Sequence, residues 1–182
     1  MQIFDTTLRD GAQREGLTYS VADKLAVARL LDQFGVGFIE GGWPGAVPKD
    51  TEFFRRARTE LDLKHALLVA FGSTRKAGVS ADQDPQIQGL LDAETPVVCL
   101  VAKSDIRHVE RALRTTGEEN LAMVRDSVAH FKKHGRRVFL DCDSGSALGS
   151  NSSCASINGL SRRPGCRACL AEPLKSSSYR NK

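Results

Sequence analysis

The stretch Asp5-Thr-Thr-Leu-Arg-Asp-Gly-Ala-Gln13 directly follows a short apolar segment, Ile3-Phe4, near the start of the chain. The apolar segment predicts a short strand that ends near Asp5–Leu8, so that Arg9 and Asp10 lie just past it. A dinucleotide-binding sheet would carry GxGxxG after its first strand. The stretch lacks that spacing, and the sequence therefore does not indicate a nucleotide-binding fold of this kind.

Beyond this stretch, short apolar runs alternate with longer amphipathic runs. The apolar runs predict further strands at Val36–Glu40, His65–Phe71, Pro96–Ala102 and Val138–Asp141. Helices are expected between them, from Ser20 to a stop at Gly35, at Asp50–Leu61, from Asp84 to Leu91, at Asp105–Leu113 and from Thr116 to Gly135. This alternation implies a parallel sheet with right-handed crossovers. It does not by itself distinguish an open sheet from a barrel.

Local signals mark several of the helix ends. Ser20-Val-Ala-Asp23 and Thr116-Gly-Glu-Glu119 both have the spacing of a capping box. In the first helix, apolar residues recur at i, i+3, i+4 and i+7, namely Val27, Leu30, Leu31 and Phe34. These patterns favour helices that begin at Ser20 and Thr116.

The pattern stops at Ser144. Residues 144–182 contain ten Ser and three Cys, and they carry six Lys/Arg against one Glu. Such a composition buries too little apolar surface to offset chain entropy, so a disordered segment is expected there. Cys166-Arg-Ala-Cys169 has CxxC spacing, but it lacks the second ligand pair of a zinc site and the βαβ context of a redox site. We therefore predict two regions, a folded domain at 1–143 and an unstructured segment at 144–182.

The bulk composition is that of a globular protein. The chain has 182 residues, of which 41% are hydrophobic and 26% are charged. Residues 1–143 carry 20 basic and 21 acidic residues, so nothing in the domain suggests nucleic-acid binding. No apolar run approaches the roughly 20 residues of a membrane span, and the N-terminus has no signal-peptide pattern. The expected location is the cytoplasm, with neither nucleic acid nor membrane as a partner.

Charged residues gather where the first two strands are expected to end. Arg9 and Asp10 follow the first strand, and Glu40 ends the second. The carboxyl ends of parallel strands build the active site in α/β folds. A carboxylate there suits Mg²⁺ or Mn²⁺, and an adjacent Arg suits a carboxylate or an enolate-like oxygen. A purely structural ion pair explains the same pattern equally well.

The stretch Asp5–Gln13 closely resembles the signature of the DRE-TIM metallolyase superfamily, which includes isopropylmalate, homocitrate and citramalate synthases and acyl-CoA lyases. Phe38-Ile-Glu-Gly-Gly-Trp-Pro-Gly45, followed by Pro48-Lys-Asp50, is most similar to the citramalate synthase branch. The likeness extends to about residue 141. The resemblance implies the N-terminal half of a (β/α)₈ barrel, with about five strands and four helical layers.

The resemblance also implies an acyltransferase that condenses acetyl-CoA with pyruvate, a 2-keto acid, in branched-chain amino-acid biosynthesis. Asp10 would bind a divalent metal, Mg²⁺ or Mn²⁺ with Zn²⁺ as an alternative. Arg9 would face the substrate oxyanion, Glu40 would orient Arg9 or the substrate, and Gln13 would assist the metal or substrate shell. Asp143 stands where relatives carry a Glu and would contact substrate. Family members are expected to be homodimers.

Two departures from the family pattern separate this chain from its relatives. The family takes further metal ligands from a His-x-His motif on a later strand. This chain has four histidines, and no two of them have that spacing: His65, His108, His130 and His134. His130 and His134 are spaced i, i+4 and are expected to have solvated or helix-terminal roles. The expected continuation of the fifth strand gives way to Ser-rich sequence after Asp143. We interpret the chain as truncated with an unrelated segment, as a frameshift would give, and expect it to be inactive alone.

Two alternative functions stay open at this point. The first is another reaction of the same superfamily, 2-isopropylmalate or homocitrate synthesis or acyl-CoA lysis. The second is a non-catalytic half-barrel fragment, since a complete barrel of this type typically needs about 250 residues and a half-barrel leaves open sheet edges.

Overall fold

The computed structural model describes residues 2–143. The segment 144–182 and the cysteines within it lie outside these described residues. In chain order the elements are β1 (Phe4–Asp5), η1 (Gly11–Gln13), α1 (Val21–Gln33), β2 (Phe38–Gly42), α2 (Pro48–Glu60), β3 (Leu67–Ser73), α3 (Pro85–Asp92), β4 (Val97–Lys103), α4 (Ile106–His108), η2 (Val109–Leu113), α5 (Gly117–Lys133) and β5 (Arg137–Asp143).

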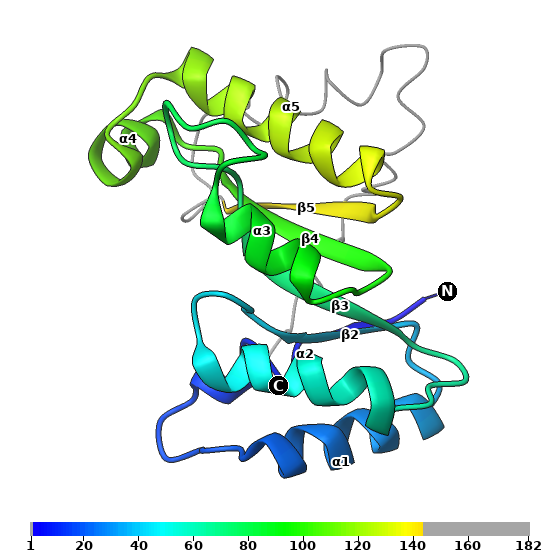
Figure 1. The fold of residues 1–182 in the computed structure, drawn as a ribbon. Helices are drawn as coiled ribbons and strands as arrows, with labels where there is room; N and C mark the ends of the chain where they lie inside the picture. The colour runs from blue at the N-terminus through cyan, green and yellow to red at the C-terminus, as the bar shows by residue number, and fades with distance from the viewer. Residues whose placement is uncertain (1, 144–182) are drawn as a thin grey trace.

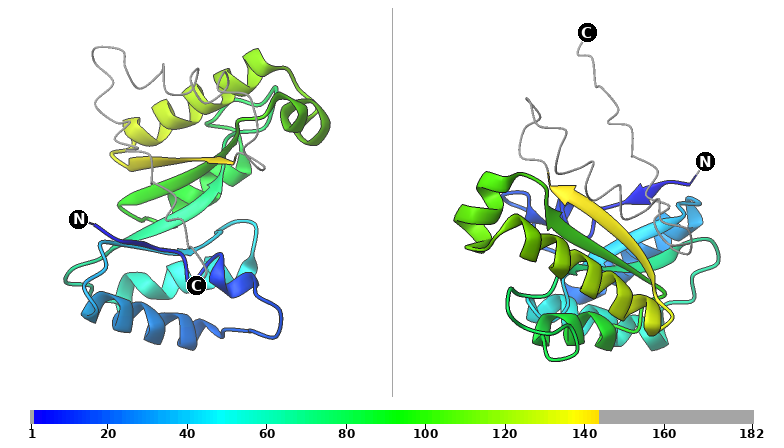
Figure 2. Two further views of the ribbon diagram at one scale, coloured as in Figure 1. Left: turned by 180° about the vertical axis from the view of Figure 1, so that it is seen from behind. Right: turned by 90° about the horizontal axis from the view of Figure 1, so that it is seen from above.

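The five strands form one parallel sheet in the order β1-β2-β3-β4-β5 (Figure 1). Each strand therefore pairs with the next one along the chain, as in a barrel, and the order never reverses as it does in a doubly wound sheet. The helices cover one face of the curved sheet (Figure 2). The fold is the N-terminal half of a TIM-type barrel, as the resemblance implied.

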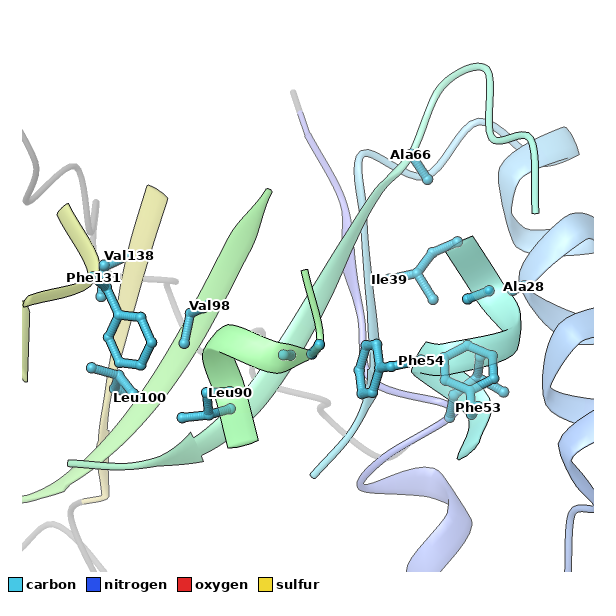
Figure 3. Close-up of a cluster of buried hydrophobic side chains, with 14 of the residues drawn as sticks. Ala28, Ile39, Phe53, Phe54, Ala66, Leu90, Val98, Leu100, Phe131 and Val138 are labelled. Carbon is cyan, nitrogen blue, oxygen red and sulfur yellow. The ribbon is translucent and has the colours of Figure 1, made fainter. Parts of the chain in front are cut away.

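The main hydrophobic core lies between the sheet and these helices. Every second residue of a strand points to this side, so that Ile39 of β2, Ala70 of β3 and Val98 of β4 are buried in it. Phe53 and Phe54 of α2 also pack there (Figure 3). This core fixes the strand ends from which the candidate site is built.

The opposite face of the sheet is lined by a second apolar cluster. Phe4 on β1 and Phe139 on β5 belong to the first and last strands, yet their ring centroids lie 5.7 Å apart. Phe38 lies between them, with its ring centroid 6.0 Å from that of Phe4 and 5.0 Å from that of Phe139. The sheet is therefore curved enough for its two edge strands to share side-chain contacts, as the interior of a barrel requires.

Several predicted boundaries shift in the structure. The third strand begins at Leu67 instead of His65, and the second helix begins at Pro48, where proline fits the first helical turn. The segment predicted as a helix at Asp105–Leu113 divides into α4 and a π-helical turn, η2, and Arg114, which follows η2, has the left-handed conformation. Among the described residues, no helix is long and apolar enough to cross a bilayer.

The two predicted capping boxes have different outcomes. At Ser20 the box is complete, with reciprocal hydrogen bonds between Ser20 and Asp23. At Thr116 only half of it forms: the Thr116 hydroxyl accepts the backbone N–H of Glu119, whereas the Glu119 carboxylate accepts from Arg75 and from the Gly78 N–H. The buried Arg75, in the loop after β3, competes successfully for that carboxylate.

Candidate active site

Arg9 and Asp10, which follow β1, come together with Glu40 of β2 as predicted, although β2 continues to Gly42 instead of ending at Glu40. The Arg9 Nε–H donates to Glu40 Oε1, and Arg9 Nη1 lies 3.1 Å from Asp10 Oδ1. The Glu40 side chain is 1% exposed, whereas that of Asp10 is 63% exposed. Arg9 therefore connects a buried carboxylate with a carboxylate that faces solvent.

An aromatic side chain fixes the plane of the Arg9 guanidinium. The Arg9 Cζ lies 3.9 Å from the centroid of the Phe71 ring, a distance at which the two groups form a cation–π contact. Trp43 packs edge-on against the same ring, with centroids 5.3 Å apart. Trp43 therefore packs against Phe71 beside Arg9.

Two further side chains, Cys99 and Asp141, lie near Glu40. Cys99 of β4 and Asp141 of β5 both lie close enough to the Glu40 carboxylate to influence its ionisation. Burial raises the pKa of the Glu40 carboxyl, and this exceeds the opposing effects of Arg9 and Cys99. Burial and the nearby carboxylates also raise the pKa of the Cys99 thiol, which favours its neutral form.

Gln13 and Asp143, the other two predicted residues, lie at the same end of the sheet. Gln13 ends the η1 turn, where its backbone N–H donates to the Asp10 carbonyl and its side chain is exposed. Asp143 is the last residue of β5, opposite Lys103 in the register. Their roles in substrate binding stay predictions.

The sequence analysis missed Cys99 and Asp141. Cys99 lies in an apolar strand, and nothing in the sequence of β4 distinguishes it from a core residue. Strand alternation was the available signal, because residues two apart along a strand lie on the same face of the sheet. It places Cys99 on one face with Val97 and Val101, and Asp141 on one face with Phe139. What alternation alone could not give is the strand order that brings this face toward Glu40.

The described residues supply only part of a metal centre. Within residues 2–143, no group of three or more His, Cys, Asp or Glu side chains could hold a metal ion. Asp10 offers one solvent-facing carboxylate, and a hard divalent cation needs six or more oxygen ligands, some of them waters. Asp10 is therefore one ligand of such a site and does not form a complete one.

Taken alone, the geometry suits recognition of an anionic oxygen. Guanidinium has five N–H donors, and the contacts with Glu40 and Asp10 occupy two of them. The rest of this planar fork can donate to a carboxylate or to an oxyanion.

Comparisons with known proteins identify the family of the chain. The HMGL-like family model matches residues 1–160. The (R)-citramalate synthase of Streptomyces coelicolor is 70% identical over 141 residues, covering 78% of this chain and 26% of that protein. The (R)-citramalate synthase of Aquifex aeolicus is 48% identical over the same shares. The chain thus spans about a quarter of the length of these curated relatives.

The likeness to solved structures confirms the fold. A hydroxymethylglutaryl-CoA lyase from Acinetobacter baumannii, solved with coenzyme A and 3-methylmalate, superposes with a TM-score of 0.62 at 18% identity. The match covers 88% of this chain and 52% of that structure, as expected for half of a barrel. The chain therefore belongs to the HMGL-like family, within the superfamily whose signature its first strand carries.

Proposed function

We propose that this chain carries the Arg9–Asp10–Glu40 half of the active site of a citramalate-synthase-type acyltransferase, which condenses acetyl-CoA with pyruvate. The observation that carries the proposal is the orientation of Arg9: a buried Glu40 and the Phe71 ring hold it at the strand ends. The 70% identity to a protein named (R)-citramalate synthase supports this substrate choice over that of the other superfamily members.

The proposed reaction places negative charge where Arg9 can meet it. The α-carbon of acetyl-CoA loses a proton and attacks the keto carbon of pyruvate, so the keto oxygen becomes an alkoxide. Water then cleaves the thioester and releases coenzyme A. The unoccupied N–H donors of Arg9 would bind that oxygen or the pyruvate carboxylate.

Each neighbouring residue has a proposed part in holding Arg9 or the ligand. Glu40 accepts the Arg9 Nε–H and sets the direction of the guanidinium, and Cys99 lies beside the Glu40 carboxylate. Gln13 and Asp143 would contact substrate from the adjacent loop and from the end of β5. Asp10 would contribute one ligand to a divalent cation, Mg²⁺ or Mn²⁺ with Zn²⁺ as the alternative, and this cation would polarise the keto group.

The setting proposed for this activity is a homodimeric enzyme in the cytoplasm, with small-molecule partners only. About three quarters of the length of the relatives lies outside the matched segment. The proposed activity is therefore to be tested in a complete barrel. A chimera provides it: residues 2–143 replace the matching segment of the Streptomyces coelicolor enzyme. We expect coenzyme A release with acetyl-CoA and pyruvate, and a much lower kcat/KM with 2-ketoisovalerate.

Arg9→Met in this chimera tests the proposed role of Arg9. Loss of a preorganised donor to a developing oxyanion costs on the order of 10²–10³-fold in kcat. Arg14→Met is the matched control, because Arg14 is an exposed arginine in the same loop, and we expect it to leave kcat within about twofold, as surface changes away from a site usually do. A folded Arg9→Met chimera with unchanged kcat, or a chimera that prefers 2-ketoisovalerate, would contradict the proposal.

A further inference from the structure

Two histidines face each other at the end of α5. His130 and His134 are four residues apart, and their ring centroids lie 4.5 Å apart with an interplanar angle of 42°. His130 is half-buried and His134 is exposed. Because α5 starts beside the strand ends and finishes before β5 begins, this pair lies at the opposite end of the fold from Arg9.

A backbone hydrogen bond fixes the orientation of one ring. His134 Nδ1 lies 2.9 Å from the carbonyl oxygen of His130, which accepts the Nδ1–H. A neutral imidazole that donates through Nδ1 presents its Nε2 lone pair outward. Metal-binding histidines commonly use this arrangement, since the second ring nitrogen donates to a carbonyl or carboxylate that orients the ring.

Partial burial and neighbouring groups favour the neutral form of His130. Partial burial and the neighbouring His134 lower the pKa of His130, as does Lys133, while Asp82 acts in the opposite direction. A neutral imidazole is the form that binds a metal. Asp82, in the loop before α3, also places a negative charge close to the pair.

We propose that His130 and His134 form a surface chelate for a borderline divalent cation of the Zn²⁺ class, at a site separate from the active site. Two histidines at i, i+4 on one helix face form a chelating pair in zinc enzymes with an H-x-x-x-H spacing. Imidazole suits Zn²⁺, Cu²⁺ and Ni²⁺ and is a poor ligand for Mg²⁺. Water completes the coordination, so the affinity is moderate and the site selects against the hard cation proposed for Asp10.

A Zn²⁺ titration of the full 182-residue chain, followed by the side-chain ¹⁵N resonances of its histidines, tests the proposal. We expect the ring-nitrogen resonances of His130 and His134 to shift together with one midpoint. His134→Gln should weaken Zn²⁺ binding at His130 by at least roughly tenfold, because the second ligand of a chelate acts at high effective concentration. His108→Gln is the matched control and should leave both resonances unchanged.

The reciprocal variant His130→Gln repeats the test from the other ring, and circular dichroism verifies that both variants are folded. Separate midpoints for the two histidines, or a His130 titration unaltered by His134→Gln, would overturn the proposal. Because the readout is residue-specific, Zn²⁺ bound by cysteine thiols elsewhere in the chain does not produce the predicted result. The outcome is also independent of whether the chain supports acyl transfer.

Discussion

At the residue scale, Asp32 shows how one buried carboxylate connects two elements. Asp32 lies near the end of α1 and is 5% exposed. Its oxygens accept the backbone N–H groups of Lys64, His65 and Ala66, at 2.9, 2.8 and 2.7 Å. Burial alone would raise the pKa of Asp32, but the three donors lower it below the ordinary value. The carboxylate therefore fixes the loop that leads into β3.

Asp32→Asn should lower the free energy of unfolding by about 1.5–3 kcal/mol at pH 7, because hydrogen bonds to a charged acceptor are lost. Urea unfolding measures this, with Asp62→Asn, an exposed Asp in the same loop, as the control. A carboxyl group whose pKa is lowered by folding stabilises the folded state at pH values above its unfolded pKa, which is about 3.9 for Asp. The difference between wild type and Asp32→Asn should therefore shrink as pH falls below about 4, and a difference independent of pH would contradict the assignment.

The candidate site itself could be predicted only in part at this scale. Arg9, Asp10 and Glu40 were identified because strand ends and a specific signature both pointed to them. Cys99 and Asp141 were not, since their approach to Glu40 depends on the curvature of the sheet. Leu30 and Phe34 belong to the apolar face predicted for α1, yet both are exposed. Helical spacing therefore identifies an apolar face but does not show whether another element covers it.

At the scale of elements, the sequence predicted the five strands and the main helices, but not the short η1 turn, the division of Asp105–Leu113 into α4 and η2, or the ion pairs that join the elements. Lys24 of α1 is 1% exposed, and its ammonium contacts Asp50 of α2. The second Asp50 oxygen accepts the Trp43 N–H at 2.8 Å, directly after β2. A Cβ at Gly42 would lie 2.4 Å from the Asp50 carboxylate, so only glycine fits between them. Nothing in the pattern of α1 distinguishes this lysine from a solvated one.

Lys24→Met should destabilise the domain by about 3–5 kcal/mol, because it leaves a buried carboxylate without its cation. Asp50→Asn and the double variant complete a cycle, and we expect the double change to cost clearly less than the two single costs combined. Trp43 is the only tryptophan of the chain, so its fluorescence reports this contact directly. Lys49→Met, at an exposed lysine of α2, is the control. Strictly additive costs would mean that Lys24 and Asp50 are not coupled.

At the scale of the molecule, the strand order is what the alternation of elements could not supply. A β-α-β pattern is compatible with a sheet that reverses direction and with one that closes. The resemblance of Asp5–Gln13 selected the barrel, and the sequential order of β1 to β5 confirms it. The contact of Phe4 with Phe139 on the inner face agrees with a barrel, because the aromatic side chains of the two edge strands can pack together only if the sheet curves.

The central claim is that residues 2–143 hold one half of a catalytic centre whose other half lies in the remainder of the barrel. Acetyl-CoA- and pyruvate-dependent release of coenzyme A tests it most directly, measured in parallel on the chimera and on the purified 182-residue chain. We predict turnover by the chimera within about tenfold of the Streptomyces coelicolor enzyme, a difference of about 1.4 kcal/mol in barrier height, and none by the chain alone. A folded but inactive chimera, or turnover by the chain alone, would contradict the claim.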